Sequence, residues 1–145
     1  MAARHPTWQI TLIGPVLKKI PSVASNIHFL GAKPLDLLPS YLSFFDVAII
    51  PFTHCPVAFH SNPIKAYDYL AMGLPVVSSP IQELLRYRHV IHVARDRAVF
   101  FSLVEKLLQN TGSEHDIKER IHVARSCTWD QVFNTMNDIL SEFGQ

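Results

Sequence analysis

The sequence is poor in charge and in cysteine, and it contains no long apolar run. Charged residues make up 17% of the 145 residues, against about 25% in ordinary soluble domains. Cys55 and Cys127 are the only cysteines. They lie far apart and without the spacing of a metal site, so we predict a reduced, cytoplasmic protein in which both are small buried side chains. No apolar stretch approaches the roughly 18 residues that can cross a bilayer.

The distribution of charge bears on the partners of the chain. A net charge of +1 creates no field that would attract nucleic acid, and no basic stripe with interleaved aromatic residues is present. The first 80 residues hold only 8 of the 25 charged side chains, whereas residues 81–125 hold 14. We therefore predict no nucleic-acid partner, and a buried parallel sheet whose loops face another domain.

Short apolar runs alternate with helical patterns along the chain. The predicted strands are 8–13, 26–30, 47–50, 75–78 and 89–93. The predicted helices are 36–44, 62–73, 79–86, 96–110, a segment from 113 and a segment from 128 to the end. This alternation predicts one α/β domain over residues 1–145, a Rossmann-like parallel sheet with helices on both faces. In such a sheet the candidate site is the loops at the carboxyl ends of the strands, 14–15, 31–32, 51–62 and 78–79.

The last three predicted helices have recognisable caps and apolar faces. Asp96 is a predicted cap, and Ser113 with Asp116 and Thr128 with Gln131 are predicted capping boxes. The apolar positions are Phe100, Leu103, Val104 and Leu107 in the first helix, and Trp129, Val132, Phe133, Met136, Leu140 and Phe143 in the last. We expect these helices to dock on the domain rather than to bind a cofactor.

The stretch 61–78 has the features of an anion-binding helix that leads into a buried strand. Asn62 can cap the helix, the following proline suits its first turn, and Gly73 can end it. Free N–H groups and the positive end of the helix dipole would hold an anion there, beside Lys65. Asp68 follows three residues later on the same face, an arrangement that suits a diphosphate joined to a ribose.

The same residues also allow a purely structural interpretation. Asn-Pro and Gly-x-Pro are ordinary helix boundaries, and Lys65 with Asp68 could be a solvated ion pair that contributes little. Ser78 and Ser79 could offer hydroxyl groups at a strand end, but a serine before proline is more simply the cap of the next helix, which we favour.

Residues 65–77, Lys-Ala-Tyr-Asp-Tyr-Leu-Ala-Met-Gly-Leu-Pro-Val-Val, resemble the signature of glycosyltransferases with the GT-B fold, in their C-terminal, nucleotide-sugar-binding domain. A strand ending Ile-Gly-Pro, a Leu-Pro-x-Tyr-Leu helix and a tryptophan at the start of the last helix follow the same order. The resemblance therefore covers nearly the whole chain. It implies the C-terminal half of a GT-B fold that lacks its first strand and helix, and the absence of the N-terminal acceptor domain.

The resemblance also implies a function. The chain would bind a nucleoside diphosphate sugar, in the first place a UDP-sugar, for transfer of a hexosyl or related group to a glycan or lipid-linked acceptor. Lys65 would face the diphosphate and Asp68 the ribose, with His60, Ser61 and Asn62 completing the site. Glutamate is usual in the family where Asp68 stands, and many members have a second glutamate where this chain has His60.

The resemblance places the catalytic base mainly in the other half of the enzyme, so the catalytic residues stay unknown and we name none in this chain. It implies no metal and no other cofactor. The full-length enzyme would be cytoplasmic or peripheral at the inner face of the membrane. Because unpaired strand edges and few charges favour association, we expect the chain alone to self-associate and to lack transferase activity.

The histidines have simpler interpretations. His54 and His60 flank a predicted flexible loop, but a metal site needs three or four ligands and no third ligand has a usable spacing. His28 and His92 fall within predicted strands, where we expect satisfied core residues.

Two other functions share the alternating plan. One is a receiver or flavodoxin-like module and the other an interaction module that keeps only the fold. A receiver needs an aspartate at the end of the third strand, where this chain has Pro51 and Phe52. A dinucleotide-binding enzyme would show Gly-x-Gly-x-x-Gly after the first strand, where Gly14-Pro15-Val16 stands.

Overall fold

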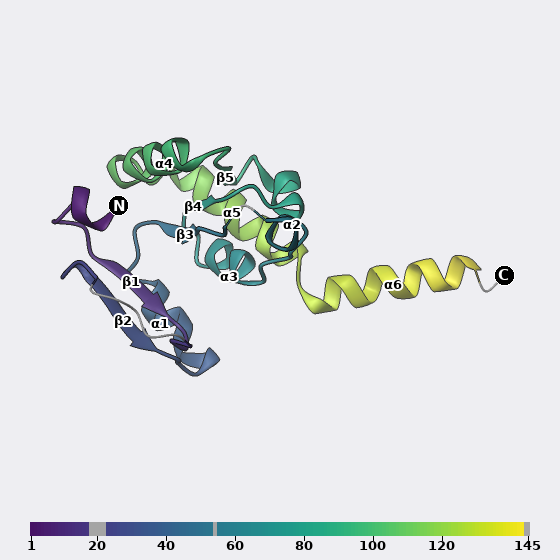
Figure 1. Ribbon diagram of the computed structural model, residues 1–145. Helices are drawn as coiled ribbons and strands as arrows, with labels where there is room; N and C mark the ends of the chain where they lie inside the picture. Colours follow the sequence, from purple (N-terminus) through teal and green to yellow (C-terminus); the bar gives the residue numbers. More distant parts are fainter. Residues whose placement is uncertain (18–22, 54, 144–145) are drawn as a thin grey trace. The chain divides into compact units, whose positions relative to one another are not determined.

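The computed structural model describes residues 1–17, 23–53 and 55–143. Its chain divides into two compact units, Met1–Ser43 and Phe44–Gln145, drawn in Figure 1. The described strands all pair in parallel, in one two-stranded and one three-stranded sheet with helices beside them. The predicted α/β class, a Rossmann-like half of the GT-B fold, is thereby confirmed, and the single-domain assignment of residues 1–145 stays a prediction.

The first unit contains two strands and three short helical segments. These are η1 (Ala2–Arg4), β1 (Ile10–Ile13), β2 (Ile27–Gly31), η2 (Leu35–Leu37) and α1 (Leu38–Leu42). The predicted strands are confirmed with tighter bounds, and Ile10 lies opposite Ile27. The predicted helix 36–44 is divided into a 3-10 turn and a short α-helix. Pro39 lies in the first turn of α1, where its missing N–H is not needed.

A buried asparagine organises the start of this unit. Asn26 is only 6% exposed. Its side-chain Nδ2 lies within hydrogen-bond distance of the carbonyl oxygens of Ala2, His5 and Trp8, at 3.3, 3.0 and 2.8 Å. Its own backbone carbonyl accepts from Ile10 N–H at 2.9 Å. Since buried polar groups must be paired, this single amide holds the segment that leads into β1.

The second unit is built around a sheet with the order β3-β4-β5. Its elements are β3 (Ala48–Ile50), α2 (Pro56–Phe59), α3 (Lys65–Ala71), β4 (Val76–Ser78), η3 (Gln82–Tyr87), β5 (Ile91–Val93), α4 (Arg97–Gln109), α5 (Glu114–Ser126) and α6 (Trp129–Phe143). Figure 1 shows α3, α4 and α5 gathered around this sheet.

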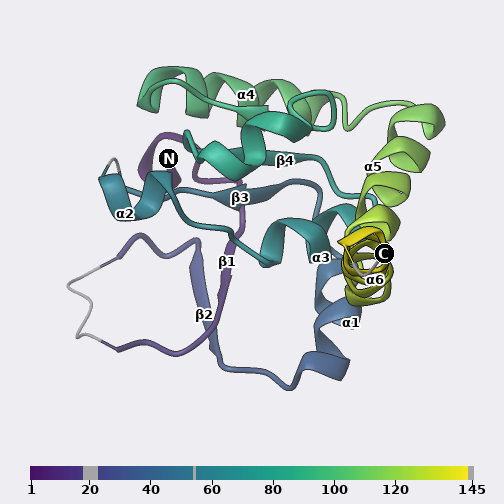
Figure 2. The same ribbon diagram turned by 90° about the vertical axis from the view of Figure 1, so that its right-hand side faces the viewer.

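The central strand β4 is covered on both faces. Its three residues are 0% exposed, although successive residues of a strand point to opposite faces. Part of this cover comes from α4, which lies alongside β4 in Figure 2. Phe100, Val104 and Leu107 of α4 are buried, as the apolar stripe predicts. The predicted cap is confirmed, because Asp96 Oδ1 accepts from Val99 N–H at 2.8 Å.

Helices α3 and α5 pack closely where α3 ends. Gly73 follows α3 with φ +71°, and a Cβ added to it would lie 2.8 Å from Ile117 Cγ2 of α5. Only glycine combines this backbone conformation with the close approach. At its start α5 has the predicted capping box, in which Ser113 N–H donates to Asp116 Oδ2 at 2.7 Å and Asp116 N–H donates to Ser113 Oγ at 3.3 Å.

The last helix, α6, differs from the prediction. Its apolar side chains are exposed, including Trp129 at 83%, Phe133 at 63% and Leu140 at 65%, so the expected docking of this face is not observed in the described part of the chain. Phe143 falls outside the described side chains. Only half of the predicted capping box is present, since Thr128 Oγ1 accepts from Gln131 N–H at 3.4 Å. Within the described ranges, no helix has the length and apolarity needed to cross a membrane.

Candidate functional site

Helix α3 presents the two predicted ligand-binding side chains on its surface. Lys65 is its first residue and Asp68 lies one turn later, and both are exposed. No ion pair joins them among the contacts of the described residues. Lys65 Nζ instead lies 5.3 Å from the centroid of the Phe52 ring. Partial burial raises the pKa of the Asp68 carboxyl. The interpretation of these residues as a solvated ion pair is therefore not supported.

The start of α3 differs from the prediction. Asn62 does not cap the helix, because the N-cap position is Ile64 and no side chain bonds there. The N–H groups of Ala66 and Tyr67 donate to the carbonyls of Pro63 and Ile64, each at 2.9 Å. Tight turns thus precede the helix and take up N–H groups that were expected to be free. The predicted anion site keeps the charge of Lys65 and has a weaker contribution from the helix start.

The segment before α3 is more ordered than predicted. Residues 56–59 form the one-turn helix α2, not a flexible loop, because Cys55 Sγ caps it by accepting from Ala58 N–H at 3.5 Å. His60 follows as an exposed C-cap residue. The Ser61 hydroxyl donates to the Ala58 carbonyl at 2.7 Å. His54 lies outside the described residues.

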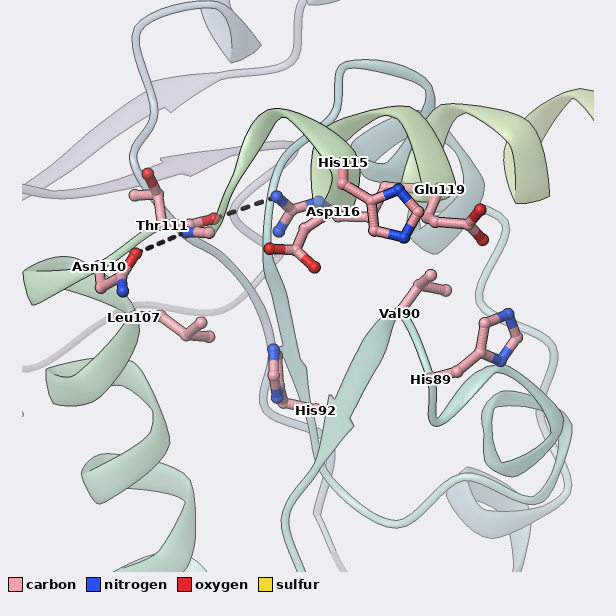
Figure 3. A pocket seen from close by; sticks show the side chains of 11 residues that line it. His89, Val90, His92, Leu107, Asn110, Thr111, His115, Asp116 and Glu119 are labelled. Atoms are coloured by element: carbon pink, nitrogen blue, oxygen red, sulfur yellow. Dashed lines mark hydrogen bonds between the residues drawn. The ribbon is translucent and has the colours of Figure 1, made fainter.

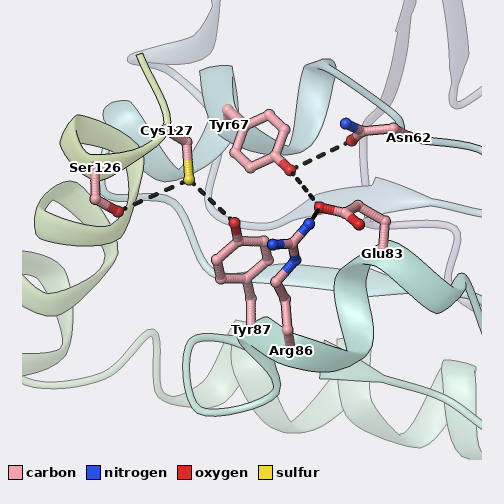
Figure 4. A network of polar contacts seen from close by, with 7 residues as sticks. All are labelled: Asn62, Tyr67, Glu83, Arg86, Tyr87, Ser126 and Cys127. Carbon is pink, nitrogen blue, oxygen red and sulfur yellow. Dashed lines mark hydrogen bonds and ion pairs between the residues drawn. The ribbon is translucent and has the colours of Figure 1, made fainter. Parts of the chain in front are cut away.

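A polar network around Tyr67, shown in Figure 4, holds the predicted site residue Asn62. The Tyr67 hydroxyl lies 3.3 Å from Asn62 Oδ1 and 3.5 Å from Glu83 Oε1. Glu83 also forms an ion pair with Arg86 of η3. The Tyr67 ring meets Tyr87 edge to face, with centroids 5.9 Å apart. Burial raises the pKa of the Tyr67 hydroxyl. Sequence reasoning missed this network, because its members are far apart along the chain.

The network continues to the end of α5 through a thiol. The Tyr87 hydroxyl lies 3.2 Å from Cys127 Sγ, and Ser126 Oγ lies 3.8 Å from the same sulfur. Burial first, and then the contact with Cys127, raise the pKa of the Tyr87 hydroxyl. Cys127 is partly exposed and Cys55 is exposed, so the prediction of two buried cysteines is wrong. Both sulfurs act as hydrogen-bond partners instead.

Ser78 and Ser79 join strand ends rather than cap a helix. Ser79 Oγ lies 2.8 Å from the Phe52 carbonyl and 3.2 Å from the Ile50 carbonyl, and Ser78 Oγ donates to the Ser79 carbonyl at 2.8 Å. The next helical segment, η3, begins only at Gln82. The predicted cap is therefore wrong, because the carbonyls at the end of β3 take the hydroxyl. This contact positions Phe52, the ring beside Lys65.

The loops predicted to form the site are divided between the two units. In the first unit Gly14 N–H donates to the Gly31 carbonyl at 2.9 Å, and a cavity of about 300 Å³ next to it is lined mainly by apolar side chains such as Leu12, Val16 and Phe29. In the second unit Ser79 brings 78–79 against the start of 51–62. Each pair of loops is thus brought together within its own unit.

The histidines expected in the core lie elsewhere. His28 is exposed, with Nε2 2.6 Å from Gln9 Oε1, and His92 is accessible from a cavity beside β5. Both predictions are wrong, because side chains alternate between the two faces of a strand, and those of His28 and His92 lie where no side chain buries them. Within the described residues, no group of three or more His, Cys, Asp or Glu side chains could hold a metal ion.

Comparison with known proteins identifies the family. Residues 1–110, which include the signature segment, match the family model described as Glycosyl transferases group 1. The chain belongs to the group 1 glycosyltransferases. It is 26% identical over 146 residues to TuaH of Bacillus subtilis (strain 168), named as a teichuronic acid biosynthesis glycosyltransferase. The aligned region is 91% of this chain and 36% of TuaH, so the chain spans about a third of the length of this relative. No solved structure is significantly similar to it.

Proposed function

We propose that this chain binds the donor of a glycosyl transfer reaction, a nucleoside diphosphate sugar and in the first place a UDP-sugar. The observation that carries the proposal is the state of α3 in a group 1 glycosyltransferase: Lys65 and Asp68 share one exposed face and are not paired with each other. A cation and a carboxylate left available in this way match a diphosphate and a pair of ribose hydroxyls.

Each side chain has a separate role in the proposed reaction. The Lys65 ammonium neutralises charge that develops on the diphosphate as the sugar leaves, a task that needs no metal ion. The Asp68 carboxylate accepts hydrogen bonds from the ribose. Asn62 is held through its carbonyl oxygen by Tyr67, which leaves its amide N–H groups for the phosphate or the sugar. Ser61 Oγ can still accept a hydrogen bond, and the exposed His60 is available to the phosphate or the sugar.

The acceptor and its binding region belong to a longer enzyme in this proposal. The chain corresponds to 36% of TuaH, and the name of that relative refers to teichuronic acid biosynthesis. We therefore propose a glycan or lipid-linked acceptor, bound largely by residues outside this chain. Chemistry then requires both parts, because donor, acceptor and base must be held together.

Calorimetric titration of the chain with UDP, GDP and FMN tests the proposed donor site. We expect UDP to bind, GDP to bind less tightly, and FMN not to bind. Binding of FMN alone would support a flavodoxin-like module. Absence of binding by all three would support an interaction module that keeps only the fold.

A further inference from the structure

The second unit contains a cavity of about 410 Å³ that the proposed donor site does not use. It lies at the amino end of β5, between the end of α4 and the first turns of α5 (Figure 3). The signature helix α3 starts at the opposite, carboxyl edge of this parallel sheet. The volume falls within the range of about 300–1,000 Å³ that is usual for small-molecule sites.

A buried arginine with unused donors lines this cavity. Arg120 of α5 is 4% exposed. Its one hydrogen bond among the described residues runs from Nη2 to the Thr111 carbonyl at 3.0 Å, and its buried Nε–H has no partner there. A guanidinium has five N–H donors, and a buried cation is costly unless its donors are paired. Arg120 is therefore a buried cation with N–H donors that lack an acceptor within the described residues.

The wall of the cavity comes close to this guanidinium at a glycine. Gly112 has φ +101°, and a Cβ added to it would lie 2.9 Å from Asp116 Oδ2 and 3.2 Å from Arg120 Nη2. A larger residue would push against both charged groups. Glycine therefore keeps the backbone close to Arg120 without filling the space in front of it.

The remaining polar groups select what can enter. Asp116 and the Arg120 guanidinium are neighbours, because both approach Gly112. Figure 3 shows His92 facing the same space as Asp116, with His115 and Glu119 at the rim. Burial first, and then Arg120, lower the pKa of His92, which favours the neutral imidazole, a form that can donate one hydrogen bond. Two carboxylates beside a single buried cation repel an anion of high charge, and that of Asp116 can accept hydrogen bonds from hydroxyl groups.

We propose that this cavity binds a singly charged carboxylate that carries several hydroxyl groups, the chemistry of a sugar acid. The carboxylate pairs with Arg120, whose planar fork matches its two oxygens. Hydroxyl groups donate to Asp116, Glu119 at the rim contributes only its negative charge, and the C–H face of the ring lies against Val90 and Leu107. Because the cavity is at the far edge of the sheet, this site does not depend on the donor assignment.

Titration of the ¹⁵N-labelled 145-residue chain with D-glucuronate, followed by two-dimensional NMR at pH 7, tests the proposal. We expect saturable shifts of the Gly112 N–H and the Arg120 Nε–H. D-glucose has the hydroxyl groups without the charge, and inorganic phosphate has charge without the ring. Both should bind more weakly. Absence of shifts at these two groups, or equal shifts with D-glucose, would overturn the site. Tighter binding of phosphate would overturn the sugar-acid assignment.

Three variants test whether the charges around the cavity control the affinity for glucuronate. Glu119→Gln removes a rim charge and should tighten glucuronate binding by about two- to threefold. Glu114→Gln is the matched control on the same helix. Glu114 is exposed, pairs with Lys118 at 2.7 Å and does not line the cavity. The affinity of this variant for glucuronate should therefore equal that of the wild type. Arg120→Gln should weaken binding by roughly tenfold or more. If that variant does not fold, the two glutamate variants decide, and equal affinity of both would overturn the proposal.

Discussion

Among single residues, Lys65 and Asp68 of α3 give the strongest support for the proposed donor site. Lys65 and Asp68 are three positions apart, so they lie on one helical face. In the structure both side chains are exposed and they form no ion pair with each other. Spacing alone could not exclude an ion pair between them. It is the side-chain positions that leave both available to a ligand.

Lys65→Ala should weaken the binding of UDP much more than the binding of uridine. The lost contact is to phosphate, and a hydrogen bond to a charged group contributes about 1.5–3 kcal/mol. Calorimetric titration of both ligands against the wild type measures the difference. Lys118→Ala is a suitable control, because Lys118 is also exposed and forms only a surface ion pair with Glu114. An equal loss for UDP and uridine would place Lys65 outside the phosphate site.

Asp68→Asn should remove most of the preference for UDP over its dideoxyribose analogue, because a ribose hydroxyl loses its charged acceptor. If the preference is unchanged, the role of Asp68 is structural.

The same substitution should not lower stability at neutral pH. Partial burial raises the pKa of Asp68 above its ordinary 3.8, so the folded state binds this proton more tightly than the unfolded state. The stability that the proton confers is complete below pH 3.8 and is lost as the pH rises through the folded pKa. The Tm of the asparagine variant should therefore equal or slightly exceed that of the wild type at pH 7. A clearly lower Tm there would contradict the assignment.

At the scale of elements, the contact between α3 and α5 depends on a glycine. Gly73 has φ +71° and no room for a Cβ against Ile117, whereas Gly31 has φ +70° and nothing within 4 Å. The two glycines share a backbone conformation and differ in what surrounds them. Comparing them separates the cost of the left-handed conformation from the cost of the helix contact.

Gly73→Ala should lower the free energy of unfolding more than Gly31→Ala does. The positive φ costs each alanine about 1 kcal/mol. Only the alanine at position 73 also overlaps a packed helix, which typically costs a further ~1–3 kcal/mol. Denaturant unfolding of both variants measures the difference. Similar losses would mean that α5 moves aside without cost.

In the whole molecule, the two sheets of the described chain end in strand edges that pair with no further described strand, and α6 has an exposed apolar face. Open strand edges and contiguous apolar side chains both favour association. Within α6 the apolar arc includes Val132, Phe133, Met136 and Leu140, all more than 40% exposed.

The weight-average sedimentation coefficient of the chain should therefore rise with concentration. Replacing Phe133 and Leu140 together by glutamate should reduce this rise, because it places charge in the apolar arc. Asn134→Glu with Ser141→Glu adds the same charge, at the same spacing along the helix, to the other face of α6 and is the matched control. If both pairs behave alike, or if the wild type sediments as a monomer throughout, the apolar face does not drive association.

Sequence alone determined the features that depend on neighbours along the chain. The strand and helix order, the Asp96 cap and the Ser113 capping box need only a few adjacent residues, and the signature 65–77 pointed to the family that the comparison confirmed. Tertiary structure decided where hydrogen bonds formed between distant segments. Ser79 bonds to the end of β3 and Asn62 to Tyr67, so neither caps a helix, because a nearby carbonyl or hydroxyl competes with the backbone N–H. The burial of Arg120 beside Thr111 likewise depends on how α4 and α5 meet β5, which no local pattern encodes.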